Sequence, residues 1–343
     1  MLEKINLGMS LDDNPADSVN GIDMLKDEKK KWWEFETELK WKNIIILSVF
    51  HLMSLYFIIT FNYRKELFLT FWIIVMVHLS AVGVTGGVHR LWSHRSYKAK
   101  LPLQIILALL YASAGLNRIY DWVRDHRIHH KYSDTDADPH NSSRGLWFSH
   151  VGWLMMKKHP EVVRKGRAVD MSDIETNPVI TFVDRHFTLF KIIFSLIIPV
   201  FIPVYLFNQN LKATIIAIFF IKNTILLNGI WSINSIAHNF GYQPYDKSIK
   251  PSDNFMVGLV SFGEGWHNYH HVFPWDYRAA EMDGILFNST KIWLDLFAKI
   301  GWVYDMKKAS PELIQKVKVN KGDGSVKAHR FTEISDEIQR EFH

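Results

Sequence analysis

The sequence predicts an all-α membrane protein, with four transmembrane helices in two hairpins and a cytosolic helical cap that holds a histidine-rich site for two metal ions. Three observations predict this class. The apolar residues, 48% of the chain, are concentrated in long blocks. Short polar links join these blocks in pairs. After each pair the pattern H-x-x-H-H appears, and its two copies lie about 140 residues apart.

Four of the blocks are long enough to cross a bilayer. At about 1.5 Å per residue, some 20 helical residues cross a hydrocarbon core of roughly 30 Å. Short links at 62–66 and 208–210 make consecutive blocks antiparallel neighbours. Pro199 and Pro203 are expected to bend the third block. The predicted spans are residues 44–61, 67–88, 189–207 and 211–236.

The sequence around the spans sets the expected domain boundaries. We expect a membrane domain over residues 43–303 and a cytosolic N-terminal segment over residues 1–42, of which 1–25 are disordered. Lysines and tryptophans precede the first span, which is typical of a cytosolic interfacial anchor, and no removable signal peptide is visible. Residues 304–343 are expected to form a charged cytosolic tail with no role in the core.

Two further apolar segments are not expected to span the membrane. Leu101–Leu116 is short and begins with Pro102, which favours an interfacial or re-entrant helix. Residues 285–303 carry large apolar side chains at helical spacing, which favours an amphipathic helix lying on the surface. The pair Gly86-Gly87 is expected to permit close helix packing.

The composition excludes several classes of site. Cysteine is absent, so disulfides, cysteine-bound zinc, iron–sulfur clusters and a thiolate-ligated haem are excluded. The net charge of +5 could suggest nucleic acid, but the basic residues flank apolar blocks and no nucleic-acid motif is present. A lipid bilayer and an anionic ligand are the expected partners.

Nine histidines are candidate metal ligands. On a helix, positions i, i+3 and i+4 share a face, so each H-x-x-H-H is expected to direct three imidazoles the same way. With 17 histidines in 343 residues, two such patterns arise by chance in roughly one sequence in a thousand, which favours a metal site over accidental surface histidines. The candidates are His89, His94, His126, His129, His130, His238, His267, His270 and His271.

Nine imidazoles are too many for one metal ion and suit two ions with positions left open, as in a catalytic site. The hairpins put all nine on the side of the N terminus, and the lysine-rich flanks make that side cytosolic. Iron is the metal expected at a water-poor, all-nitrogen site that activates oxygen. Asp125, Asp138 and Glu264 are candidates to accept imidazole N–H groups, or else they cap helices.

Several ionisable residues leave alternatives open. His51 and His78 lie inside predicted spans and are interpreted as neutral packing residues. Lys222 either snorkels to the membrane surface or faces a protein-lined cavity. The spacing of Lys157 and Lys158 fits a solvated surface as well as a phosphate site.

Four segments resemble a known family: GVHRLWSHRSY from residue 87, RDHRIHHKYS from 124, DADPHN from 136 and GEGWHNYHH from 263. From about Trp41 to Gly324 the chain resembles the animal acyl-CoA desaturases, above all the stearoyl-CoA desaturases and their insect relatives. The resemblance implies a multi-pass enzyme of the endoplasmic reticulum membrane with both termini cytosolic. It also implies an oxidoreductase with two iron ions (Fe2+) that inserts a double bond into a saturated long-chain acyl-CoA. The reaction would use O2 and electrons from cytochrome b5 and its NADH-dependent reductase.

The resemblance also implies residue roles. The nine histidines would ligate the irons, and Asn234 would hold an iron through water. Trp122 resembles the tryptophan at the bend of the substrate tunnel. This comparison favours the phosphate-site interpretation of the two lysines. The family's acyl-CoA contacts fall on Asn43, Asn117, Arg124, Asp125, Lys157, Lys158 and Trp231.

The chain departs from the family pattern beside the expected tunnel. Ile230 stands where members that act between carbons nine and ten usually have a small hydroxyl residue, and Leu116 replaces a glutamine. Arg118 replaces an acidic residue, and Val77 stands where vertebrate enzymes have a tyrosine. Double-bond position, its geometry and the preferred chain length are therefore open, with a Δ9 or an insect Δ11-like product expected.

Other functions fit parts of the pattern. A membrane di-iron fatty acid hydroxylase or a sphingolipid desaturase would have the same histidines. A histidine-rich zinc transporter would also be basic and multi-pass, but it should carry ionisable residues along several spans. A purely structural membrane protein has no need for nine histidines. No cytochrome b5 module is visible, so the electron donor is expected to be a separate protein.

Overall fold

The computed structural model describes residues 37–281 and 288–325, whose regular secondary structure is almost entirely helical. Four helical segments in this part of the chain are long and apolar enough to span a membrane, as predicted. Their bounds are Trp41–Thr60, Leu67–Ser93, Phe187–Leu206 and Leu211–Ser235. The expectations for the N-terminal anchor and the disordered segment fall on residues 1–36, outside the described residues.

The first pair of membrane-length segments leads into the first of the predicted histidines. Helix α1 (Trp41–Thr60) is apolar on all sides, and only Ser54 within it is buried, so its surface suits contact with lipid. Helix α2 (Leu67–Val82) continues directly into the π-helix η1 (Gly83–Ser93). The segment ends at Ser93 rather than at residue 88, because every residue of η1 is buried and packed against neighbouring helices.

The third segment alternates between α- and π-helical turns around its two prolines. It comprises α9 (Phe187–Ile192), η4 (Ile193–Ile197), α10 (Ile198–Phe201) and η5 (Ile202–Leu206). Pro203 has no N–H to donate to the carbonyl of Pro199 four residues earlier. The indole N–H of Trp72 in α2 donates to that carbonyl instead, at 2.9 Å. A neighbouring helix therefore satisfies the group that proline leaves free, as membrane helices require.

The fourth segment comprises α11 (Leu211–Ile215), η6 (Ile216–Lys222) and α12 (Asn223–Ser235). The side chain of Asn210 caps it by accepting from Ala213 N. Lys222 is fully buried and donates to the carbonyl of Ser113 and to Asn223 Oδ1. The ammonium is therefore held in the protein interior and does not snorkel to the membrane surface.

The short apolar helix α3 (Leu101–Ser113) packs against α2 and η1 with Leu103, Leu107 and Tyr111 buried. The closest approach is at Gly83, where an added Cβ would lie 2.3 Å from Tyr111 N. At Gly86 the nearest atoms would be 3.7 Å away, which is ordinary contact. Close packing therefore depends most on Gly83. Of the predicted Gly86-Gly87 pair, Gly87 contributes, because an added Cβ there would lie 3.3 Å from Trp92 and 3.4 Å from Leu107.

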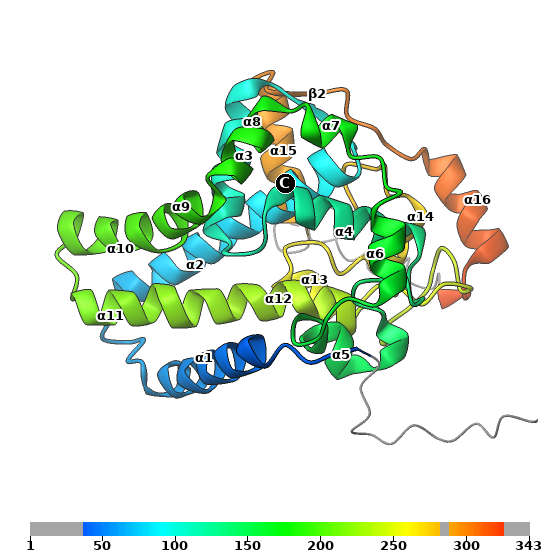
Figure 1. Cartoon of the computed structure of the whole chain (residues 1–343). Coiled ribbons are helices and arrows are strands. Elements are labelled where there is room, and N and C mark those ends of the chain that lie inside the picture. Colours follow the sequence, from blue (N-terminus) through cyan, green and yellow to red (C-terminus); the bar gives the residue numbers. More distant parts are fainter. Residues whose placement is uncertain (1–36, 282–287, 326–343) are drawn as a thin grey trace, which may run out of the picture. The chain divides into compact units, whose positions relative to one another are not determined.

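The remaining elements form a part of the fold that we call the cap. In Figure 1 the four apolar segments extend to the left, while α4, α6, α14 and α16 lie at their right-hand ends. The cap comprises α4 (Ile119–Lys131), η2 (Ser142–Arg144), α5 (Leu146–His150), η3 (Gly152–Leu154), α6 (Pro160–Gly166), α7 (Ser172–Glu175), α8 (Pro178–Arg185), α13 (Phe255–Val260), α14 (His267–Val272), α15 (Ser289–Lys299), α16 (Pro311–Lys321) and the antiparallel strands β1 (Lys98–Ala99) and β2 (Val303–Tyr304).

The C-terminal part of the described chain packs into the cap. Ala309 and Ile314 are buried in an apolar cluster with Tyr245, Tyr269 and Phe273. The backbone N–H of Ala309 also donates to the side chain of Asp276 at 2.9 Å. The expectation that residues after 304 have no role in the core was wrong for this part. The charges of α16 conceal its buried face in the sequence, because only Ile314 within it is buried.

Candidate metal centre

The first two histidines of the site lie at the end of η1. In an α-helix, residues five apart are about 140° apart around the axis. Here the N–H of His94 donates to the carbonyl of His89 at 3.1 Å, a hydrogen bond of the π-helical type that spans five residues. The two ring centroids lie 4.9 Å apart. The π-helix therefore brings this pair to one side of the segment.

Three further histidines come from α4, whose start is fixed by a side chain from another helix. The first two N–H groups of α4 donate to the carboxylate of Asp184, each at 2.8 Å. An acidic group here satisfies free donors and interacts favourably with the helix dipole. The last turns of α4 then carry His126, His129 and His130.

The remaining four histidines lie after α12 and in α14. His238 follows α12, and α14 carries His267, His270 and His271. The side chain of Asp253 fixes α14 by accepting from the N–H groups of residues 268 and 269 at 2.9 and 3.2 Å. The two H-x-x-H-H helices, α4 and α14, are distant in the sequence and thus meet near the ends of η1 and α12.

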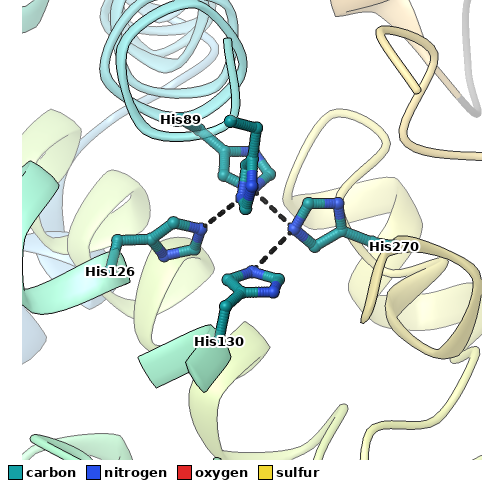
Figure 2. Close-up of side chains that lie close together, drawn as sticks. His89, His126, His130 and His270 are labelled. Atoms are coloured by element: carbon teal, nitrogen blue, oxygen red, sulfur yellow. Dashed lines mark hydrogen bonds between the residues drawn. The ribbon is translucent and has the colours of Figure 1, made fainter. Parts of the chain in front are cut away.

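The structure brings all nine predicted histidines together in two groups. Within each group, the candidate ligand atoms lie within 4.8 Å of one another. Figure 2 shows imidazoles of the first group pointing toward a common centre. The first group is His89, His94, His126, His130 and His270; the second is His129, His238, His267 and His271.

Each H-x-x-H-H contributes to both groups, contrary to the expectation that its three imidazoles point the same way. In α4, His126 and His130 belong to the first group and His129 to the second. In α14 the division is the same by position, with i and i+4 together and i+3 apart. Positions i+3 and i+4 lie about 100° apart around a helix, so one helix can face two sites.

The spacing of the ring nitrogens fits bound metal ions. Neighbouring Nε2 atoms lie 2.8 to 3.3 Å apart across the two groups. A metal–imidazole bond is about 2.1 Å, so two nitrogens on one ion are about 3.0–3.4 Å apart at right-angled to tetrahedral geometry. His270 Nε2 has two such neighbours, which a single proton or lone pair cannot serve. The residues therefore fit two metal ions.

Carboxylates bind the other ring nitrogen of three of these histidines. The Nδ1 atoms of His89, His129 and His238 lie 3.0, 2.9 and 3.1 Å from carboxylate oxygens. A donated Nδ1–H fixes the tautomer and leaves the Nε2 lone pair free for a metal. The acceptors are Glu264, Asp138 and Asp134, in the same order.

Two of these acceptors were predicted and one was missed. Asp138 and Glu264 were named as candidates, whereas Asp134 was not. The sequence signal was present, because Asp134 belongs to the same acidic run as Asp138. Its backbone φ of 60°, which Asp adopts more readily than most residues, is visible only in the structure. The third candidate, Asp125, instead pairs with Arg124 and Lys158, so its prediction as an imidazole acceptor was wrong.

Burial keeps most of the histidines neutral. It lowers the pKa of six of them well below the ordinary value, and the neighbouring imidazoles and arginines lower it further. Neutral imidazole is the form that binds a metal ion. The six are His94, His126, His130, His267, His270 and His271.

Arg90 holds the carboxylate of Glu264 in its charged form. Burial acts to raise the pKa of Glu264, but Arg90 and His89 outweigh it and lower that pKa to about 2. Arg90 is 1% exposed and donates to Glu264 Oε1 at 2.7 Å and to the carbonyl of Tyr277 at 3.0 Å. The prediction missed Arg90, although it is adjacent to His89 in the sequence.

His140 was also missed as a part of this site. It forms a third group with His129 and Asp138, and its Nδ1 lies 3.3 Å from Asp138 Oδ1. Burial lowers the pKa of His140 to about 3. The run DADPH gave the signal, because His140 follows Asp138 by two residues and can contact the carboxylate that also binds His129.

A cavity of about 240 Å³ runs beside the two groups of histidines. Asn117, Trp122 and Asp125 line one part, and His89, His126, His129 and His267 line another. A third part lies within the membrane-length helices and is apolar, with Leu47, Leu226 and Leu227. The cavity therefore joins the two groups of histidines to the interior of the bundle of membrane-length helices.

The structure places the predicted substrate residues at different distances from this cavity. Asn117, Trp122, Asp125 and Trp231 line it, as does the predicted iron-binding Asn234. Arg124 and Lys158 contact it through the carboxylate of Asp125. Asn43 donates to the carbonyl of Leu154, which lines the cavity, and the exposed Lys157 pairs with Glu38.

The departures from the family pattern fall partly on this cavity. Leu116 and Ile230 line it. Arg118 instead pairs with Asp121 on the protein surface, and Val77 is buried in the apolar core. Only the first two can therefore contact a molecule in the cavity without rearrangement.

Residues 39–281 match the family model for fatty acid desaturases. The acyl-CoA Delta-9 desaturase of Acheta domesticus is 45% identical over 299 residues, which cover 87% of this chain and 83% of that protein. The acyl-CoA Delta(11) desaturase of Spodoptera littoralis is 47% identical over 84% of this chain and 85% of its own. Human stearoyl-CoA desaturase is 43% identical over 85% of this chain and 81% of its own.

Proposed function

Since the chain belongs to the fatty acid desaturase family, we propose that it is an acyl-CoA desaturase, an oxidoreductase that inserts a double bond into a saturated long-chain fatty acyl-CoA. The observation that carries this function is the pair of histidine groups opening on an apolar cavity within the membrane-length helices. Relatives named for Delta-9 and Delta-11 desaturation support a product of one of these two kinds.

The reaction fixes what the site must supply. Two hydrogens leave adjacent carbons of the acyl chain, and O2 takes them up together with two electrons and two protons to give two water molecules. Two bound iron ions would supply the oxygen activation that this oxidation needs, since imidazole ligands suit iron. The nine histidines would hold them, with Asn234 contributing through water.

The chain's own residues orient the ligands and exclude water. Glu264, Asp138 and Asp134 fix the imidazole tautomers, and Arg90 keeps the first of these carboxylates charged. Burial lowers the pKa of six of the imidazoles and keeps them neutral. The apolar part of the cavity suits the saturated chain, whose burial is favourable at about 0.8 kcal/mol per CH2 group.

The polar end of the cavity suits the coenzyme A part of the substrate. Arg124 and Lys158 share the carboxylate of Asp125, and Lys157 is exposed nearby in the sequence. Cations of this kind bind phosphate groups through charge-assisted hydrogen bonds. We assign this end to the nucleotide of acyl-CoA and its three phosphate groups, with Asn43, Asn117, Trp122 and Trp231 contacting the remainder.

The membrane arrangement follows from the same assignment. Two hairpins would place the cap and both termini on the cytosolic side of the endoplasmic reticulum membrane, because lysines flank the spans on that side. Cytosolic histidines can receive electrons from cytochrome b5 and its NADH-dependent reductase as separate partners.

Expression in a yeast strain that lacks its own desaturase tests the function. We expect monounsaturated fatty acids in the lipids of cells that carry the wild-type chain and none in cells that carry His270→Ala. Gas chromatography with mass spectrometry identifies the products. An inactive wild-type protein that is expressed and loaded with iron would contradict the proposal.

Product analysis and metal analysis together separate the other candidate functions. A di-iron hydroxylase would add oxygen to the acyl chain, and a sphingolipid desaturase would modify ceramide in place of acyl-CoA. A zinc transporter would contain zinc instead of two irons per chain, which metal analysis of the purified protein decides. The lining of the cavity by metal-binding residues favours chemistry on a bound molecule over transport.

A further inference from the structure

Phe262 has an unusual backbone conformation at the wall of the cavity. Its φ is 61°, and among the six described non-glycine residues with positive φ it is the only aromatic one. A bulky side chain in this left-handed region strains the backbone, and such strain persists mainly where surrounding structure imposes it at functional sites. This residue is therefore a candidate for a role in the reaction.

The turn that contains Phe262 does not itself require a phenylalanine. After α13 the N–H of Gly263 donates to the carbonyl of Gly258 at 3.0 Å, which is the hydrogen bond of a Schellman motif. Glycine usually occupies the left-handed position of this motif, and here it comes one residue later. The turn thus accepts strain at Phe262 although a glycine would remove it. The phenylalanine side chain itself is therefore the feature that this position retains.

Phe262 lines the cavity together with Thr85, Ile230 and Glu264. Glu264, two residues further on, binds Nδ1 of His89. Phe262 is only partly buried and packs at the edge of the apolar core, which suits a side chain between the core and the cavity. Its position links the wall of the cavity directly to the metal-binding groups.

Two other helices hold the ring in place. The imidazole of His78 in α2 meets it edge-on, with ring centroids 5.0 Å apart and planes at 77°. The indole N–H of Trp293 in α15 donates to His78 Nε2 at 2.7 Å. The hydrogen bond orients His78, and His78 in turn limits the movement of Phe262.

We propose that Phe262 is a specificity-determining residue that contacts the saturated acyl chain and sets which pair of carbons lies at the metal centre. His78 and Trp293 are positioning residues that act through it. This inference rests on the proposed desaturase function. A smaller side chain at 262 would let the acyl chain take a different path past the metals, so the distribution of products would change.

Product profiles of variants in the desaturase-deficient yeast test this proposal. Phe262→Leu keeps the backbone conformation costly and shortens the side chain, while Phe262→Gly also removes the strain. We expect both to change the ratio of double-bond positions or chain lengths about fivefold or more, since one methylene group alters discrimination by about 10-fold or more. Trp293→Phe keeps the ring but loses the N–H, and we expect a smaller change in the same direction.

The matched control is Phe255→Leu, which makes the same substitution at an exposed position at the start of α13. We expect its product ratios to equal those of the wild type. A merely structural role of Phe262 would lower all products in proportion, and unchanged ratios in active Phe262 variants would overturn the proposal. If the Phe262 variants give too little product to measure, the product profile of Trp293→Phe tests the proposal instead. An unshifted profile in that variant overturns the proposed role of Phe262. A wild-type chain without product would instead refute the desaturase function itself.

Discussion

The orientation of single imidazoles in the metal centre depends on the residues that bind their second nitrogen. Asp138 illustrates this most fully. Its carboxylate accepts from His129 Nδ1 at 2.9 Å and from two backbone N–H groups, so it connects the imidazole to the loop after α4. Burial acts to raise the pKa of Asp138, but the neighbouring histidines and these N–H groups lower it strongly. Asp138 therefore remains an acceptor.

Asp138→Asn is expected to weaken metal binding without unfolding the protein. The amide keeps the volume and one acceptor but loses the charge that orients His129. Loss of such a partner lowers metal affinity about 10- to 100-fold. Metal content after equilibration with a competing chelator measures the effect. Asp121→Asn, which changes a carboxylate paired with exposed Arg118, is the control. Equal metal retention in the two variants would refute the role of Asp138.

A second prediction concerns substrate binding at Lys158. Lys158→Met keeps the aliphatic stem and removes the cation that pairs with Asp125. We expect KM for acyl-CoA to rise about tenfold, which corresponds to one lost charge-assisted contact, with kcat changed less than about threefold. Steady-state kinetics on purified enzyme measure both constants. Lys212→Met, at an exposed position in α11, should behave as the wild type, and a similar KM in both variants would contradict the assignment.

Among the helices, α2 and η1 connect membrane packing to the metal centre. The same continuous segment packs against α3 through Gly83 and carries His89 near its end. The change from α- to π-helical turns occurs at Gly83 itself. A shift at the packing contact would therefore displace the first histidine of the site.

Gly83→Ala is expected to destabilise the protein. The added methyl group would meet the backbone of α3 at 2.3 Å, and backbone cannot move aside as a flexible side chain can. We expect a loss of about 1–3 kcal/mol or more, which a thermal unfolding curve in detergent detects as a lower Tm. Gly86→Ala is the matched control, because its methyl group has 3.7 Å of space, and its Tm should change little. A lower Tm for Gly86→Ala than for Gly83→Ala would contradict this account.

For the molecule as a whole, the metal centre joins segments that are distant in the sequence. Histidines from η1, α4, α14 and the end of α12 contribute to two groups. The membrane-length helices and the cap are thus tied together by any ion bound there. Metal binding should stabilise the folded state because the unfolded chain has no such site.

Removal of the metal is expected to lower the stability of the whole protein. An ion present at 100 times its Kd stabilises the folded state by about 2.7 kcal/mol per site. For a chain of this size we expect chelation to lower Tm by at least about 5 °C and readdition of Fe2+ to restore it. Calorimetry of the purified protein measures this. A Tm unaffected by chelation that removes the metal would show that the centre contributes nothing to stability.

The sequence by itself determined the four apolar segments and the nine histidines, because these depend on local composition and spacing. The tertiary structure decided what spacing could not: how each H-x-x-H-H divides between two groups, which carboxylates reach them, and that Gly83 makes the close contact. It also revealed Phe262 in the cavity wall. The physical reason is that angles around a helix follow from residue number, whereas contacts between helices depend on where distant segments pack.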